Sequence, residues 1–161
     1  MIMNKDRQDF YLQKMTPSGY QKITAEIAQL DADRPAKIKA LQKARALGDL
    51  SENADYSAAK RDLRHLESRL RFLHKQLRYA DVITPQDNGK VELGTYVTLH
   101  FDDGAEEIFR IVGKQEVDVD AQLISFASPL GAALMEKKVG TTVTVEAPAT
   151  TYQVTIIKIT V

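Results

Sequence analysis

The sequence predicts an α+β protein, in which an N-terminal antiparallel two-helix coiled-coil hairpin precedes a small antiparallel β-sheet with one short helix. Two observations predict this class. As far as about residue 80, apolar residues recur at steps of three and four, which is typical of helices packed along one seam. After a turn-rich break at 84–90, apolar and polar residues alternate, which is typical of strands. We therefore expect a hairpin domain over 12–83 and a sheet domain over 90–161.

The first helix is predicted to begin at Thr16-Pro17, since threonine is a good N-cap and proline fits the first helical position. Pro35 lies inside the helix and removes one backbone donor, so we expect a continuous but bent helix. The seam is regular at first and looser beyond Leu30. Its residues are Tyr20, Ile23, Ile27, Leu30, Leu41 and Ala44.

The second helix has the cleaner heptad pattern. Its seam residues are Tyr56, Ala59, Leu63, Leu66, Leu70, Leu73, Leu77 and Ala80. The connection is expected to be short, from Gly48 to about Ser51, so the helices must be antiparallel neighbours. Each helix is then about 30 residues and about 45 Å long.

The C-terminal half is predicted to form strands over 95–101, 106–112, 122–125, 141–145 and 151–160. Between the third and fourth strands, Ser128-Pro129 is expected to cap and open a single short helix.

Two carboxylates, Asp49 and Glu52, lie at the predicted apex of the hairpin. In one interpretation they form a capping box at the start of the second helix. In the other, side chains three residues apart share a divalent cation. Mg²⁺ needs about six oxygen ligands, so the pair would serve as a metal site only inside another site that already holds metal and phosphate.

Basic residues follow one face of the second helix, within roughly 60° of each other. They are Lys60, Arg64, Arg71, Lys75 and Arg78, and Lys39, Lys43, Arg45 and Arg61 extend the set. Such a face is either a solvated flank or a guide for a nucleic-acid strand. Residues 1–80 carry 16 Lys and Arg against 10 Asp and Glu, whereas residues 81–161 carry 6 against 12, which favours the second interpretation. Tyr56 either stacks on a base or packs in the seam.

The chain has no cysteine, no apolar run long enough to span a bilayer and no recognisable secretory signal in Met1 to Phe10. These features predict a cytoplasmic protein without disulfides. His65 and His74 are nine residues apart on one predicted helix and so lie on opposite faces, where they cannot share a metal. His100 lies in a predicted strand and is expected to be a surface or core histidine rather than a ligand. No phosphate-binding loop or nucleophile motif is present.

The segment from Gly48 to Tyr56, followed by Ala58-Ala59-Lys60, resembles the most characteristic segment of the bacterial Gre family of transcript cleavage factors. Further matching segments are Met15-Thr16, Arg34-Pro35, Arg110 to Gly113, Ile124-Ser125, Ser128 to Leu130 and Lys137 to Gly140. The resemblance covers about residues 12–161 and implies an FKBP-like C-terminal domain.

The resemblance also implies a function. The factor would bind RNA polymerase as a monomer, insert its coiled coil into the secondary channel and stimulate the polymerase's own cleavage of backtracked RNA. Asp49 and Glu52 would position the polymerase's Mg²⁺ and the attacking water, so the chain would need no cofactor of its own and would not itself be an enzyme. The residues implied to contact the 3′ end of the RNA are Arg45, Lys60, Arg61, Arg64, Arg71 and Lys75.

Two other functions remain open. A protein of the same architecture could plug the channel and inhibit the polymerase, but it would not need the acidic pair. A peptidyl-prolyl isomerase would need an aromatic-lined pocket, whereas several of the five aromatics of the C-terminal half sit at strand positions expected to form the core. They are Tyr96, Phe101, Phe109, Phe126 and Tyr152.

Overall fold

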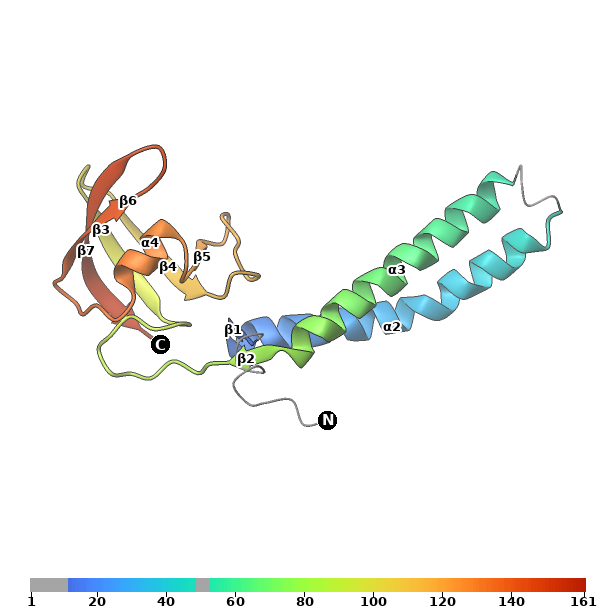
Figure 1. Ribbon diagram of the computed structural model, residues 1–161, viewed down its shortest axis with the longest axis horizontal. Coiled ribbons are helices and arrows are strands. Elements are labelled where there is room, and N and C mark those ends of the chain that lie inside the picture. The colour runs from blue at the N-terminus through green and yellow to red at the C-terminus, as the bar shows by residue number, and fades with distance from the viewer. Residues whose placement is uncertain (1–11, 49–52) are drawn as a thin grey trace. The chain divides into compact units, whose positions relative to one another are not determined.

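The computed structural model describes residues 12–48 and 53–161. The described chain forms two compact units. One is Tyr20–Tyr79, and the other joins the described residues up to Gly19 with Ala80–Val161. The first unit is a pair of long helices and the second is built around a curled sheet with one short helix (Figure 1), so the predicted α+β class is confirmed.

The hairpin consists of α2 (Pro17–Arg45) and α3 (Ala54–Arg78), and α2 passes through Pro35 without a break. Contacts between the helices pair rising residue numbers in α2 with falling numbers in α3, so the helices are antiparallel, as predicted. The contacting pairs are Glu26 with Arg69, Arg34 with Glu67, and Ala44 with Asn53.

The hydrophobic seam of the hairpin is best buried in the half that is farther from the connection between α2 and α3. Ile27 of α2 packs against three buried leucines of α3, namely Leu66, Leu70 and Leu73. Toward the apex, Leu41 and Leu63 are only half-buried. Ala44, near the end of α2, is buried at 5% exposure, but its side chain is small. The large aliphatic side chains of the seam are thus better buried around Ile27 than beyond Leu30, which agrees with the predicted loosening of the seam.

Two predicted helix boundaries were wrong. The connection is longer than the predicted Gly48 to Ser51, because α2 ends at Arg45 and α3 begins at Ala54. Ala80 does not continue the seam of α3, because the helix ends at Arg78 and Ala80 begins strand β2 (Ala80–Val82). That strand pairs in parallel with β1 (Gln13–Met15), a pairing between distant residues that the sequence pattern does not predict.

The second unit contains a five-stranded sheet in the order β5-β4-β3-β7-β6. Its strands, which lie close to the predicted ranges, are β3 (Tyr96–Phe101), β4 (Glu106–Val112), β5 (Leu123–Ser125), β6 (Thr142–Glu146) and β7 (Thr151–Thr160). Neighbouring strands are antiparallel except β4 and β5, which are parallel. The short helix α4 (Pro129–Leu134) is capped by Ser128, as predicted, because its hydroxyl accepts a hydrogen bond from the Gly131 N–H.

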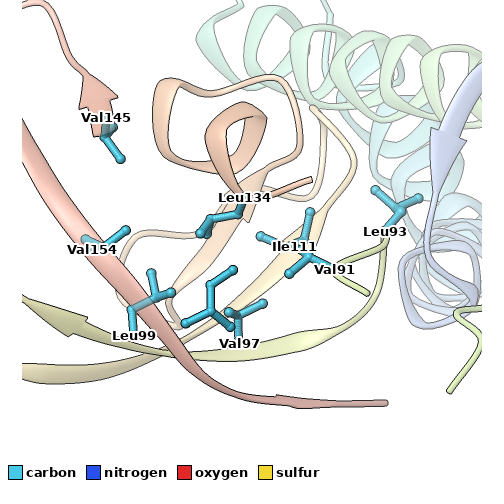
Figure 2. Close-up of a cluster of buried hydrophobic side chains, with 9 residues drawn as sticks. Val91, Leu93, Val97, Leu99, Ile111, Leu134, Val145 and Val154 are labelled. Carbon is cyan, nitrogen blue, oxygen red and sulfur yellow. The ribbon is translucent and has the colours of Figure 1, made fainter. Parts of the chain in front are cut away.

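The core of this unit is aliphatic, and Figure 2 shows its side chains converging between the sheet and α4. Val97, Leu99, Ile111, Leu134 and Ile156 are fully buried. Four of the five aromatics are partly buried against this cluster, while Tyr96 is 42% exposed, so the prediction that several of them belong to the core is confirmed.

A carboxylate from the loop after β4 holds the start of α2. The Glu116 Oε2 accepts hydrogen bonds from the Thr16 N–H at 3.0 Å and the Gly113 N–H at 2.8 Å. The Thr16 hydroxyl donates to Glu116 Oε1 and accepts from the Gly19 N–H. Thr16 is completely buried, so this network satisfies a backbone donor that water does not reach. Thr16 is thus the predicted cap, with a partner from 100 residues away.

Candidate functional site

Asp49 and Glu52, the two predicted metal-positioning residues, lie outside the described residues. The chain on both sides of them is described, from the last turn of α2 to Gly48 and again from Asn53 onward. These flanks, together with the exposed face of α3, make up the part of the candidate site that the structure defines.

One side chain joins the two helices at this end of the hairpin. Asn53 Oδ1 accepts a hydrogen bond from the Tyr56 N–H at 3.0 Å, which caps the N-terminus of α3. Asn53 Nδ2 donates to the backbone carbonyl of Ala44 at 2.8 Å, in the last turn of α2. The capping-box interpretation placed Asp49 at the cap and was wrong, because the residue immediately before α3 is Asn53 and its side chain makes the capping bond.

An aromatic ring lies directly beside this joint. Tyr56 is half-buried, and two cations approach its ring. The Arg45 guanidinium carbon lies 6.0 Å from the ring centroid and the Lys60 nitrogen lies 5.9 Å from it. Since each distance is within cation–π range, the ring brings together a cation from each helix. Tyr56 therefore contacts a cation of each helix in addition to occupying its position in the seam.

All six predicted RNA-contact residues are exposed. Arg45 is the last residue of α2, and the other five lie on α3 (Lys60, Arg61, Arg64, Arg71 and Lys75). Within residues 12–48 and 53–161, the ion pairs of the hairpin use other residues, Arg34 with Glu67 and Arg69 with Glu26. Arg71 donates a hydrogen bond to the Ser68 hydroxyl at 3.0 Å. The face is positively charged and accessible, as an anionic strand would require.

The basic face continues to the C-terminal end of α3. An open hollow there is lined by Arg71, His74, Lys75, Leu77, Arg78 and Tyr79. Cations near a helix C-terminus are also favoured by the helix dipole, so part of this clustering stabilises α3 itself.

An ion pair between Glu26 of α2 and Arg69 of α3 aligns the two helices in the half of the hairpin farther from their connection. Arg69 Nε and Nη2 donate to the two carboxylate oxygens of Glu26 at 2.7 and 3.0 Å. This hydrogen bonding lowers the pKa of Glu26 and raises that of Arg69. The two-point geometry ties one turn of α2 to one turn of α3.

Sequence reasoning missed two residues that organise these regions. Asn53 carried a detectable signal, because asparagine before a helical run is a good N-cap. Glu116 carried none, because its partners are distant in the sequence. In the described parts of the chain there is no group of three or more His, Asp or Glu residues that could hold a metal ion. Nor does any helix in those parts have the apolar length needed to cross a membrane.

Comparison with known proteins gives matches over both units. Residues 13–82 match the family model described as "Transcription elongation factor, N-terminal", and residues 86–161 match "Transcription elongation factor, GreA/GreB, C-term". "Transcription elongation factor GreA 1" of Lactiplantibacillus plantarum is 50% identical over 147 residues, covering 91% of this chain and 94% of that protein.

A second relative and a solved structure are also similar. "Transcription elongation factor GreA" of Thermodesulfovibrio yellowstonii is 44% identical over 149 residues, covering 90% of this chain and 94% of that protein. The crystal structure of the GreA factor homolog 1 protein of Thermus thermophilus has 24% identity and a TM-score of 0.43, covering 92% of this chain and 99% of that one.

A pair of long helices with exposed cations and a small curled sheet with one short helix define an α+β protein of two units. The family matches make that class specific: the chain belongs to the GreA/GreB family of transcription elongation factors.

Proposed function

We propose that this chain binds RNA polymerase, inserts its helical hairpin into the secondary channel and stimulates the polymerase's own cleavage of backtracked RNA. The observation that carries the proposal is the exposed basic face of α3 within a hairpin that matches the family's N-terminal model. Cleavage would release arrested complexes. In this proposal the factor acts as a monomer in the cytoplasm, where bacterial transcription takes place.

The basic face supports the RNA-binding part of the proposal. Arg45, Lys60, Arg61 and Arg64 are accessible near the apex, and Arg71 and Lys75 continue the same charge along α3. Each cation that neutralises a phosphate releases condensed counterions, so binding of the 3′ RNA segment should weaken steeply as salt rises. The acidic balance of residues 81–161 makes that half a poor partner for RNA.

Asp49 and Glu52 are proposed to act by completing a site that belongs to the polymerase. Two carboxylates offer too few oxygens to hold Mg²⁺ tightly by themselves, so these residues fit a shared site rather than a resident one. A metal held by the polymerase supplies charge stabilisation and activation of water in phosphoryl chemistry. In this proposal the two carboxylates orient that water and accept its hydrogen bonds. The polymerase then catalyses the cleavage, and this chain assists it without being an enzyme itself.

The proposal is tested with a stalled, backtracked elongation complex of bacterial RNA polymerase. We expect the full chain to shorten the transcript faster than polymerase alone, and we expect Asp49→Ala and Glu52→Ala each to abolish most of that acceleration. Glu107→Gln removes one negative charge from the exposed surface of β4 and serves as the matched control. No acceleration by the wild-type chain, or undiminished acceleration by Asp49→Ala, would contradict the proposal. Slower cleavage than with polymerase alone would identify an inhibitor instead.

A further inference from the structure

Phe72 places a large aromatic ring on the outside of α3. It is 46% exposed, whereas Leu70 and Leu73, which face the seam, are 9% and 1% exposed. Two residues along a helix turn by about 200°, so Phe72 lies on nearly the opposite side of α3 from Leu70. The buried cluster of the seam is formed by other residues. The ring is therefore available to a partner.

The ring is held by a side chain that is itself fixed. The Arg69 guanidinium carbon lies over the Phe72 ring, 5.3 Å from its centroid. Two hydrogen bonds, at 2.7 and 3.0 Å, tie the same guanidinium to both carboxylate oxygens of Glu26. Because Arg69 is held at two points, the ring beside it is restricted before any partner arrives. A contact with a preorganised side chain loses less conformational entropy than a contact with a mobile one.

Exposed cations lie close to the ring along α3. Arg71 is its neighbour in the sequence, and Lys75, three residues on, lies about 60° away around the helix. Arg61 lies three turns before Phe72 and within about 20° of it around the helix. Proteins that bind single-stranded nucleic acid combine these two elements, since cations bind the phosphates and aromatic rings stack on the bases.

We propose that Phe72 is a base-stacking residue: a base of the single-stranded RNA that follows the basic face stacks on its exposed ring, while Arg71 and Lys75 bind neighbouring phosphates. The inference rests on the proposed function and adds to it a contact that does not depend on charge. Because every base has an aromatic face, the contact should tolerate any RNA sequence.

The first experiment measures cleavage in a backtracked elongation complex with the full wild-type chain, Phe72→Leu and Phe72→Tyr. Phe72→Leu keeps an apolar side chain without a ring, and the factor concentration for half-maximal cleavage should rise about tenfold. The maximal rate at saturating factor should not change, because the ring does not touch the reacting atoms. The salt dependence should keep its slope, because no charge is lost. Phe72→Tyr keeps the ring and should behave like the wild type.

A second RNA separates a contact with a base from a contact with polymerase. Its backtracked segment carries abasic nucleotides away from the bond that is cleaved, so the phosphates remain and the stacking partner is absent. On this RNA the difference between the wild type and Phe72→Leu should vanish. An equal loss on both RNAs would assign the ring to a polymerase contact and refute the inference. A loss accounted for by reduced helical circular dichroism would refute it as well.

A fluorescence measurement tests the stacking without polymerase. The chain has no tryptophan, so Phe72→Trp introduces a single indole. A single-stranded oligoribonucleotide at low salt should quench its fluorescence, and an abasic strand of the same length should not. The matched control is Tyr96→Trp, because Tyr96 is 42% exposed and also has a guanidinium carbon, that of Arg110, 5.2 Å from its ring centroid.

Tyr96 belongs to the acidic half of the chain, so RNA should not quench an indole at that position. Absence of quenching at position 72, or equal quenching at both positions, would refute the inference. A wild-type chain that fails to accelerate cleavage while the indole at position 72 is still quenched would refute only the proposed function. The two failures are therefore distinguishable.

Discussion

Replacing Glu116 tests how the start of the long helix α2 is held. Its carboxylate accepts two backbone N–H bonds on one oxygen and the Thr16 hydroxyl on the other. Glu116→Gln keeps the shape: the amide oxygen takes the two N–H bonds, and the amide nitrogen donates to the Thr16 hydroxyl, whose proton turns to Ser18, 3.1 Å away. Glu116→Ala removes the acceptor of all three hydrogen bonds, from the Thr16 N–H, the Thr16 hydroxyl and the Gly113 N–H.

The two changes should differ in size. Hydrogen bonds to a charged acceptor contribute more than neutral ones, and the carboxylate also lies at the positive end of the helix dipole, so Gln should cost about 1 kcal/mol. Ala leaves the N–H of fully buried Thr16 without a partner. An unsatisfied buried donor costs about 1–3 kcal/mol, and the Gly113 N–H loses its acceptor as well, so Ala should cost about 3 kcal/mol in total.

The assay is equilibrium urea unfolding of the full chain, followed by amide NMR peaks so that the sheet unit and the hairpin unit are read separately. Glu107→Gln changes the same charge at an exposed position of β4 and should alter the free energy of unfolding by less than about 0.5 kcal/mol. If Glu116→Ala destabilised the sheet unit no more than Glu116→Gln does, the hydrogen-bond reasoning would be refuted.

Three further predictions concern other contacts. Gly113→Ala should destabilise the sheet unit by about 2 kcal/mol, because its Cβ would lie 2.3 Å from the Lys14 carbonyl oxygen; an unchanged urea midpoint would contradict this. Tyr56→Leu should raise the factor concentration for half-maximal cleavage about threefold through loss of the cation–π contacts, whereas Tyr56→Phe should not; equal effects would argue against the ring's role. The pKa of Glu26 is lowered by the hydrogen bond from Arg69, so the contribution of this pair is present above pH 4.5 and is lost as the pH falls through the lower folded-state pKa. Both side chains are more than a third exposed, so Glu26→Gln should reduce hairpin stability at pH 7 by only about 0.5 kcal/mol. The difference between the variant and the wild type in thermal unfolding should shrink as the pH is lowered below 4.5.

The candidate site was predictable to the extent that it is local. The basic residues of α3 follow helical spacing, so their common face could be read from the sequence, and all of them are exposed in the structure. The cap of α3 was assigned to the wrong residue because several polar residues precede the helix and each is a plausible cap. Only the backbone geometry shows which of them makes the bond to the Tyr56 N–H. The roles of Asp49 and Glu52 stay predictions.

The sequence by itself determined the class of fold, the approximate ranges of the five strands of the sheet, the caps Thr16 and Ser128 and the seam of the hairpin as far as Leu77. Each of these depends on a period or a residue preference within a few neighbouring positions, which physical chemistry constrains strongly. Only the tertiary structure decided the parallel pairing of β1 with β2, the hydrogen bond from the Thr16 N–H to the Glu116 carboxylate and the hydrogen bond from the Asn53 side chain to the Ala44 carbonyl. No periodic pattern in the sequence predicts these contacts, because a hydrogen bond between separate segments forms only where the fold brings those segments together.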